Sequence, residues 1–180
     1  LYFEFKLMKS CIETERLILR EMISSDDAGM FELDSNPEVH RFLGNHTVKS
    51  KEESMAVIKF VRQQYIDFGI GRWAVIEKQS GSFIGWCGIK FVTEEVNNHT
   101  NYYDLGYRLI RKHWGKGYAT ESATVCVKYA FDKLRLNQLF AAAHTENVLS
   151  NRILVNLGFK KVSVIVYDQS LHNWYVKENQ

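Results

Sequence analysis

The sequence predicts a single domain of the α/β (α+β) class, in which helices pack on the faces of a mixed sheet. Its 180 residues correspond to about one domain, and 46% of them are hydrophobic, which is enough for a full-sized core. Segments with strand periodicity alternate with segments of helical periodicity, and no Gly/Ser-rich linker divides them. We therefore expect one domain over residues 9–180, preceded by an added or disordered segment at residues 1–8.

The predicted elements follow from local periodicity and from turn and capping residues. Asp26 is placed to cap a short helix, and Ser50 with Glu53 has the spacing of a capping box that opens a longer helix, which Gly69 ends. Ser80-Gly81 predicts a tight turn between two strands. The predicted order is a strand at 12–22, helices at 26–33 and 50–68, strands at 72–78, 83–92 and 102–110, a helix at 119–134, a strand at 138–144, a helix at 150–157, a strand at 159–167 and a short strand near 174–176.

The composition excludes several classes of function. Lys and Arg number 23 against 21 Asp and Glu, whereas a duplex-binding domain shows a stronger basic bias or a clustered stripe. No apolar run is long enough to span a bilayer. Cys11, Cys87 and Cys126 are widely spaced and form no Cys-x-x-Cys pair, which is typical of reduced core thiols and not of a zinc site or a nucleophile. We expect no nucleic-acid partner, no membrane partner, no metal and a cytoplasmic location.

The most informative segment extends from Leu105 to Glu121. A predicted strand passes into a short basic loop with two glycines, Gly115 and Gly117, and a long helix begins at once. The first turn of a helix leaves its N–H groups unpaired and partly positive, and glycines let an anion approach that backbone. The pattern predicts a phosphate site, although glycines that serve only a turn would look the same. Four basic residues surround the helix start: Arg108, Arg111, Lys112 and Lys116.

Two common phosphate-binding motifs do not fit this loop. A dinucleotide fingerprint requires a third glycine at position 120, where the chain has Thr120. A Walker loop requires glycine at position 110 and Ser or Thr at position 117, where Ile110 and Gly117 stand. The loop therefore favours a phosphorylated cofactor of another kind.

The run from Trp114 to Glu121, WGKGYATE, closely resembles the acetyl-CoA loop of the GNAT N-acetyltransferases, in the form of the RimJ/RimL-like branch that acetylates ribosomal-protein N-termini. The family pattern is Arg/Gln-x-x-Gly-x-Gly/Ala, and Lys112 stands at its first position, which acts mainly through its backbone N–H. The resemblance covers about residues 12–167 and implies a GNAT-like mixed, mostly antiparallel central sheet of about six to seven strands with helices on both faces. Further segments that resemble the family lie at 13–20, 71–75, 83–88, 147–152 and 157–159.

This resemblance implies acetyl-CoA as the cosubstrate. The backbone N–H groups of residues 112–118 would hold its pyrophosphate, and the strand end at residues 109–111 would pair with its pantetheine arm as an added strand. Asn147 would contact the arm and Ser150 would lie near the thioester sulfur, although both also suit the start of a helix. The implied cofactor-binding residues are Leu109, Ile110, Arg111, Lys112, His113, Trp114, Gly115, Lys116, Gly117, Tyr118, Ala119, Asn147, Ser150 and Asn151.

The chemistry of acetyl transfer defines the catalytic candidates. The acceptor amine must lose a proton before it attacks, because a lysine amine has a pKa of about 10.4 and an α-amine one of about 8. Asp104 stands where the RimJ/RimL-like branch often carries an acid, which implies a general base that acts directly or through water; a plain strand carboxylate is the alternative. His144 is a second candidate base. Ser150 is the candidate acid and Tyr167 a weaker one.

We expect an N-acetyltransferase that transfers acetyl from acetyl-CoA to a primary amine by direct attack in a ternary complex. A protein N-terminal α-amine is one acceptor class, and a small-molecule amine of the polyamine or antibiotic type is the alternative. Glu94, Glu95 and Asp104 supply negative charge that suits either acceptor. A non-catalytic CoA-binding protein is the third reading. The chain would act as a monomer or a homodimer.

Overall fold

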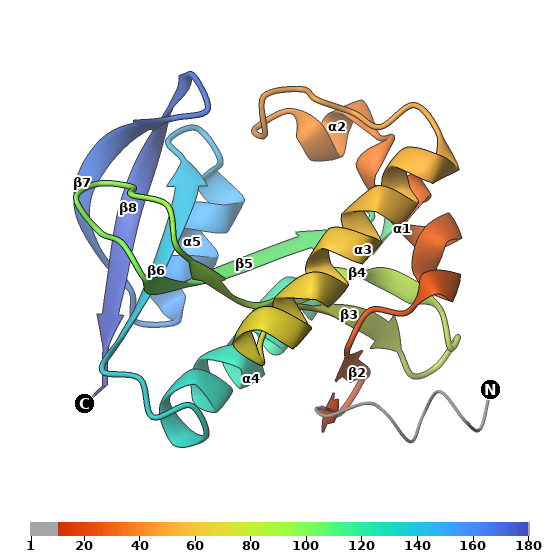
Figure 1. Ribbon diagram of the computed structural model, residues 1–180, viewed down its shortest axis with the longest axis horizontal. Coiled ribbons are helices and arrows are strands. Elements are labelled where there is room, and N and C mark those ends of the chain that lie inside the picture. Colours follow the sequence, from red (N-terminus) through yellow and green to blue (C-terminus); the bar gives the residue numbers. More distant parts are fainter. Residues whose placement is uncertain (1–10, 180) are drawn as a thin grey trace.

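One eight-stranded sheet extends through the computed structural model, which describes residues 11–179 (Figure 1). Its strand order is β1-β2-β3-β4-β5-β6-β8-β7, and every neighbouring pair is antiparallel except β5 and β6. The predicted mixed, mostly antiparallel sheet is thereby confirmed, whereas the segment expected at 1–8 lies outside the described residues. The strands are β1 (Cys11–Glu13), β2 (Leu17–Arg20), β3 (Arg72–Glu77), β4 (Phe83–Val92), β5 (Tyr102–Leu109), β6 (Gln138–His144), β7 (Lys160–Tyr167) and β8 (Ser170–Glu178).

The sheet has more strands than the predicted six to seven, because the first predicted strand is divided. β1 and β2 pair with each other across a turn in which the N–H of Thr14 donates to the carbonyl of Leu17 at 2.9 Å. β8 is also longer than the short strand expected near 174–176, since it pairs with β6 on one side and β7 on the other. His172 and Asn173 interrupt its hydrophobic pattern, yet both are buried.

Helices cover both faces of the sheet, as predicted. On one face, called the α3 face below, the hydroxyl of Tyr65 donates to the carbonyl of Arg72 in β3. On the opposite α4 face, the rings of Trp73 and Tyr129 lie edge to face, with their centroids 4.9 Å apart. The helices are α1 (Asp27–Asp34), α2 (Pro37–His40), α3 (Lys51–Phe68), α4 (Tyr118–Asp132) and α5 (Val148–Asn156), with the short 3-10 helices η2 (Ser24–Asp26) and η3 (Arg111–His113).

The capping predictions are confirmed for α3 but not for α1. The hydroxyl of Ser50 accepts from the N–H of Glu53, and Gly69 ends the helix with a φ of 70°. No side-chain cap bond is present at the start of α1. The carboxylate of Asp26 instead accepts from the N–H of Ile23 at 2.9 Å, because the chain turns through η2 before the helix begins.

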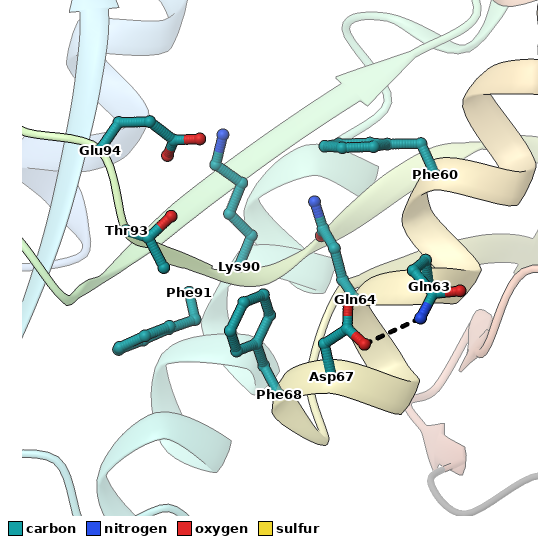
Figure 2. Close-up of a pocket in the computed structure, with 9 residues that line it drawn as sticks. All are labelled: Phe60, Gln63, Gln64, Asp67, Phe68, Lys90, Phe91, Thr93 and Glu94. Carbon is teal, nitrogen blue, oxygen red and sulfur yellow. Dashed lines mark hydrogen bonds between the residues drawn. The ribbon is translucent and has the colours of Figure 1, made fainter.

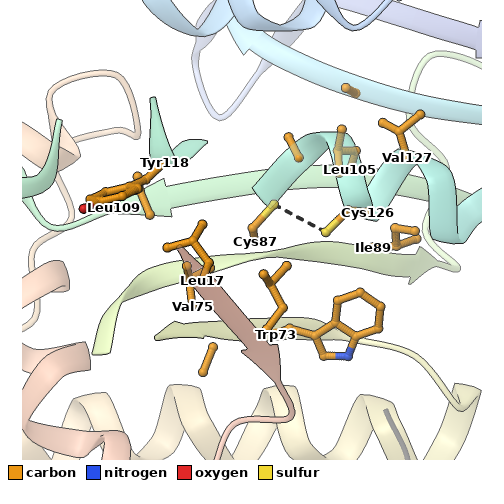
Figure 3. Packing of buried hydrophobic residues seen from close by; sticks show 14 of the residues in the cluster. Leu17, Trp73, Val75, Cys87, Ile89, Leu105, Leu109, Tyr118, Cys126 and Val127 are labelled. Atoms are coloured by element: carbon orange, nitrogen blue, oxygen red, sulfur yellow. Dashed lines mark hydrogen bonds between the residues drawn. The ribbon is translucent and has the colours of Figure 1, made fainter. Parts of the chain in front are cut away.

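The main core lies on both faces of β2–β5, where α1 and α3 pack on one side and α4 on the other; Figure 3 shows part of it. Leu17 and Trp73 are among its largest fully buried side chains. Cys87 and Cys126 lie in this core with their sulfurs 3.6 Å apart, as expected for core thiols, and burial raises the pKa of the Cys126 thiol. Cys11, in contrast, is exposed.

β5 and β6 diverge, and this feature positions the site. Their register contains one pair, Asp104 with Phe140, and the two strand arrows then point apart (Figure 1). β5 continues to Leu109 and β6 to His144 without pairing with each other. The side of β5 that faces β6 therefore lacks a strand partner after Asp104.

Candidate functional site

The loop between β5 and α4 has the backbone geometry of an anion cradle. Gly115 and Gly117 have φ angles of 72° and 81°, a left-handed conformation that costs glycine little and other residues more. Gly117 is the N-cap of α4. Within the described chain, the backbone N–H groups of residues 115–120 have no hydrogen-bond partner. These free donors at the positive end of a helix fit a phosphate group.

The basic side chains around this loop are less available than the sequence indicates. Three of the four form ion pairs with acids of α1 and α2: Arg108 with Asp34 at 2.7 Å, Arg111 with Glu38 at 2.8 Å and Lys112 with Glu32 at 2.8 Å. Lys116 is therefore the one cation of this group without an ion-pair partner among the described residues, while the role of all four charges toward an anion stays a prediction.

Side chains of the loop stabilise its own conformation. The indole N–H of Trp114 donates to the carbonyl of Leu109 at 2.7 Å, and the N–H of Ile110 donates to the carbonyl of Ile84 at 2.9 Å. Two backbone groups expected to meet the pantetheine arm thus already have partners. The ring of His113 is buried, and burial, followed by the charge of Lys116, lowers its pKa. His113 therefore contributes to the loop through its backbone and its packing.

Ser150 and Asn147 lie at the start of α5. The amide oxygen of Asn147 accepts from the N–H of Ser150 at 3.1 Å, so Asn147 is the helix N-cap, the structural alternative considered above. The hydroxyl of Ser150 lies 3.1 Å from the hydroxyl of Tyr107, which also donates to the Ser150 carbonyl at 3.0 Å. Burial raises the pKa of Tyr107. Tyr107 therefore joins β5 to α5 on the α4 face, and the sequence analysis missed it.

Asn151 connects three elements of the C-terminal half. Its amide N–H group donates to the carbonyls of His144 and Asn147 at 2.9 and 2.7 Å. Its oxygen accepts from Asn173 and Tyr175, each at 2.7 Å. Its side chain thus binds α5 to β6 and β8, while its expected role toward the nucleotide stays a prediction.

Asp104 lies on the opposite side of the sheet from Ser150. Its carboxylate forms an ion pair with Arg72, whose guanidinium also donates to the Asp104 carbonyl at 2.6 Å. Arg72 reaches this position by crossing Gly106, where a Cβ atom would lie 2.7 Å from Nη2 of Arg72. Gly106, a glycine within a predicted strand, is the sequence signal that a bulky side chain such as Arg72 crosses the strand at this position.

Tyr167 and His144 lie at the ends of β7 and β6, and within the described chain neither side chain is hydrogen-bonded to Ser150. Burial and then the charge of Asp104 raise the pKa of Tyr167, which places these two groups in one electrostatic environment. The ring of His144 lies between Phe42 and His172, at centroid distances of 5.2 and 5.4 Å. A cavity of about 360 Å³ extends from here to the β7–β8 turn. Its lining residues are Arg41, Phe42, Gly44, Asn45, His46, His144, Asp168, Gln169 and Ser170.

A second cavity, of about 140 Å³, lies between the end of α3 and the end of β4 (Figure 2). Aromatic side chains form its walls, and Lys90 and Glu94 place opposite charges at its rim. Lys90 stands directly across from Asp104 in the β4–β5 register, and burial lowers its pKa. This cavity therefore adjoins the Asp104 side of the sheet. It is lined by Phe60, Gln63, Gln64, Asp67, Phe68, Lys90, Phe91, Thr93 and Glu94.

The comparison with known families decides the identity of this arrangement. Residues 16–160 match the acetyltransferase (GNAT) domain. The chain belongs to the GNAT acetyltransferase family. It is an acetyl-CoA-dependent N-acetyltransferase, and the family domain implies acetyl-CoA as cosubstrate of this GNAT enzyme.

Relatives and solved structures agree with this assignment. The chain is 31% identical to the uncharacterized N-acetyltransferase YoaA of Bacillus subtilis, over 86% of this chain and 85% of that protein. A ribosomal-protein-S5-alanine acetyltransferase from Vibrio fischeri has the same fold, with a TM-score of 0.76, 18% identity and coverage of 95% and 97%. RimL, a ribosomal L7/L12 α-N-protein acetyltransferase, has a TM-score of 0.77 at 16% identity, with 94% of each chain covered. The resemblance to the RimJ/RimL-like branch is consistent with these folds.

The described part of the chain contains neither a metal-binding group nor a membrane-spanning helix. Among residues 11–179, no group of three or more His, Cys, Asp or Glu side chains is arranged to hold a metal ion. None of the helices in the same range is both long and apolar enough to cross a membrane.

Proposed function

We propose that the enzyme transfers acetyl from acetyl-CoA directly to a primary amine in a ternary complex, and that the acceptor is a protein N-terminal α-amine. The observation that carries direct transfer is the placement of the cofactor loop and of the candidate base on opposite faces of the sheet. Ser150, Tyr107 and the cofactor loop belong to the α4 face, and Asp104 belongs to the α3 face. The part of the sheet where β5 and β6 no longer pair lies between these two groups of residues.

This division suits direct transfer. A pantetheine arm that extends along the free side of β5 would be bound as an added strand. The cosubstrate would enter from the α4 face, and an amine from the α3 face could reach it through the part of the sheet where β5 and β6 do not pair. The thiols of Cys87 and Cys126 are fully buried in the core, so no covalent acetyl-enzyme step is proposed.

Each candidate side chain has a defined task in this scheme. Asp104 would accept the amine proton, directly or through water, with the carboxylate oxygen that Arg72 does not bind. Bound acetyl-CoA supplies an acetyl thioester with a thiolate leaving group of pKa about 8.5, so acid catalysis is of secondary importance. The hydroxyl of Ser150 would donate to that sulfur, oriented by Tyr107.

Charge on the α3 face supports a cationic acceptor. Glu94 lies beside Lys90 at the rim of the aromatic cavity in Figure 2, and Asp104 stands across from Lys90 in the β4–β5 register. The names of two structures with this fold, the S5-alanine acetyltransferase and RimL, favour a protein N-terminus. A relative at 27% identity, FsC-acetyl coenzyme A-N(2)-transacetylase of Aspergillus fumigatus, supports a small-molecule amine as the second candidate; this chain covers 65% of its length.

Two measurements test the proposal in sequence. First, CoA at large excess should raise the melting temperature, since a ligand that binds only the folded state stabilises it; no shift would reject the cofactor site. Second, thiol release should be followed with a panel of N-terminal peptides, polyamines and aminoglycosides. Turnover with peptides and not with small amines is the expected result. Turnover with small amines only would identify a small-molecule amine acetyltransferase. Binding of CoA without turnover of any amine would indicate a non-catalytic CoA-binding protein.

A further inference from the structure

Arg16 and Glu121 join the turn between β1 and β2 to the first turn of α4. Nε and Nη2 of Arg16 lie 2.7 and 2.6 Å from Oε2 of Glu121. The other carboxylate oxygen accepts from the backbone N–H of Arg16 at 3.0 Å and from the hydroxyl of Thr14 at 2.5 Å. Four donors thus hold one carboxylate in the helix turn that also supplies the free amides of the cofactor loop.

Arg16 also contacts the loop itself. Its Nη1 donates to the carbonyl of Lys116 at 2.9 Å, and its guanidinium lies 4.6 Å from the ring centroid of Tyr118. A Cβ atom on Gly117 would lie 3.3 Å from Nη2, so the guanidinium packs beside the N-cap of α4. A side chain 100 positions from Lys116 in the sequence therefore lies against three consecutive residues, Lys116, Gly117 and Tyr118.

The pairing has an electrostatic consequence for an anion. Glu121 places a negative charge within one turn of the N-terminus of α4, where a phosphate would bind, and like charges at this distance repel. The side chain of Glu121 is only 18% exposed, so solvent screens it incompletely. Arg16 supplies the compensating charge, and its own side chain stays 42% exposed next to the loop.

We propose that Arg16 is a positioning residue for the cosubstrate: it fixes the loop through the Lys116 carbonyl and neutralises Glu121, so that the free amide N–H groups can donate to the pyrophosphate of CoA. This inference rests on the cofactor-binding part of the proposed function. It predicts that Arg16 affects the affinity for the nucleotide part of CoA and leaves the chemical step unchanged.

The test compares Arg16→Ala, Glu121→Gln and the double variant with a matched control, Lys78→Ala. Lys78 forms an ion pair with Glu13 at 2.9 Å, and its ammonium donates to the carbonyl of Thr14 at 2.7 Å. This control therefore removes a cation and a hydrogen bond from the same turn but leaves the guanidinium contacts of Arg16 with Glu121 and Lys116 in place. The dissociation constant of CoA is measured by calorimetry, and kcat and KM are measured with acetyl-CoA and with S-acetylpantetheine, which lacks the pyrophosphate. Arg16→Lys is a milder second variant that keeps the charge but has fewer donors.

Arg16→Ala should raise the Kd of CoA and the KM of acetyl-CoA about tenfold, the effect of losing one charge-assisted interaction, with kcat within twofold of the wild type. Its kcat/KM for S-acetylpantetheine should be unchanged. The double variant should bind CoA more tightly than Arg16→Ala, because the uncompensated carboxylate is gone. Arg16→Lys should lie between Arg16→Ala and the wild type, and Lys78→Ala should match the wild type.

Three results would overturn the inference: an unchanged Kd in Arg16→Ala, an equal loss with both thioesters, or a double variant no better than the single one. The first two would assign Arg16 a purely structural role, and a lower melting temperature of Arg16→Ala would measure it. Failure of the wild type to bind CoA is a separate result that rejects the cofactor site itself.

Discussion

The hydroxyl oxygen of Tyr107 lies 3.1 Å from the hydroxyl oxygen of Ser150, across the junction between β5 and α5. Tyr107 has one hydroxyl proton and two acceptors within reach, the Ser150 hydroxyl and the Ser150 carbonyl. When Tyr107 donates to the carbonyl, Ser150 donates to Tyr107; when Tyr107 donates to the hydroxyl, the proton of Ser150 is free for a ligand. The pair can therefore present or withhold the proton of the candidate acid.

Tyr107→Phe should reduce kcat to about the level of Ser150→Ala, because both variants break the same hydrogen-bonded unit. The double variant should then cost little more than either single one, since coupled residues are non-additive. The loss of one hydrogen bond should lower stability by only about 1 kcal/mol. Tyr103→Phe is the control, as its ring packs on Phe91 at 5.0 Å without a hydroxyl bond to Ser150. Additive losses would show that Tyr107 does not act through Ser150.

Asp104→Asn should lower kcat most at low pH, where few acceptor amines lose their proton without a base. At high pH the amine is already neutral, and the variant should approach wild-type turnover. The measurement is kcat across the pH range in which the enzyme stays folded, with His144→Asn in parallel. A pH profile of Asp104→Asn identical to that of the wild type would exclude Asp104 as the base. If only His144→Asn changed the profile, His144 would be the base.

Gly106→Ala should displace Arg72 from Asp104. The new Cβ atom would lie 2.7 and 2.8 Å from Nη2 and Cζ of Arg72, and the guanidinium cannot move without losing its partners. Overpacking of this kind costs about 1–3 kcal/mol of unfolding free energy. In an Arg72→Ala background the same substitution should cost clearly less, because its clash partner is absent. Equal costs in both backgrounds, measured by urea unfolding, would contradict this account.

Lys116→Ala should weaken CoA binding several-fold, and Lys112→Ala should change it little. Both residues belong to the same loop, but Lys112 is paired with Glu32 at 2.8 Å and Lys116 is not paired within the described chain. A single ammonium near a phosphate contributes on the order of 1 kcal/mol in a solvent-exposed setting, and salt screens it. The difference between the two variants should therefore shrink as ionic strength rises. Equal effects of the two variants at low salt would show that Lys112 still interacts with CoA despite its ion pair with Glu32.

The free energy of unfolding should decrease as the pH falls below about 6.5, the ordinary pKa of histidine. Burial lowers the pKa of His113 in the folded state, so the unfolded chain binds the proton more readily and acid favours unfolding. His113→Phe should make this pH dependence shallower, as measured by denaturant titrations at pH 5 to 8. An equally steep pH dependence in His113→Phe and in the wild type would show that His113 is not its cause.

Much of the fold could be predicted because its signals are local. The helix from Ser50 to Gly69 and the strand at 83–92 have the predicted limits, since caps, glycines and periodicity act within a few residues. The predicted length of β8 was too short, because the polar residues His172 and Asn173 interrupt the strand pattern although both are buried. Their burial depends on pairing with β6 and β7, which no window of sequence contains.

The sequence by itself determined the family, the sheet with helices on both faces and the Gly-x-Gly cradle at the start of α4, because these depend on residues close together in the chain. Only the tertiary structure decided which charges are free and which carboxylates are compensated. Arg16 meets Glu121 across 105 positions, and Arg72 meets Asp104 across 32. Such pairs form when packed elements bring distant side chains together, so a count of charges along the chain does not show which of them are paired.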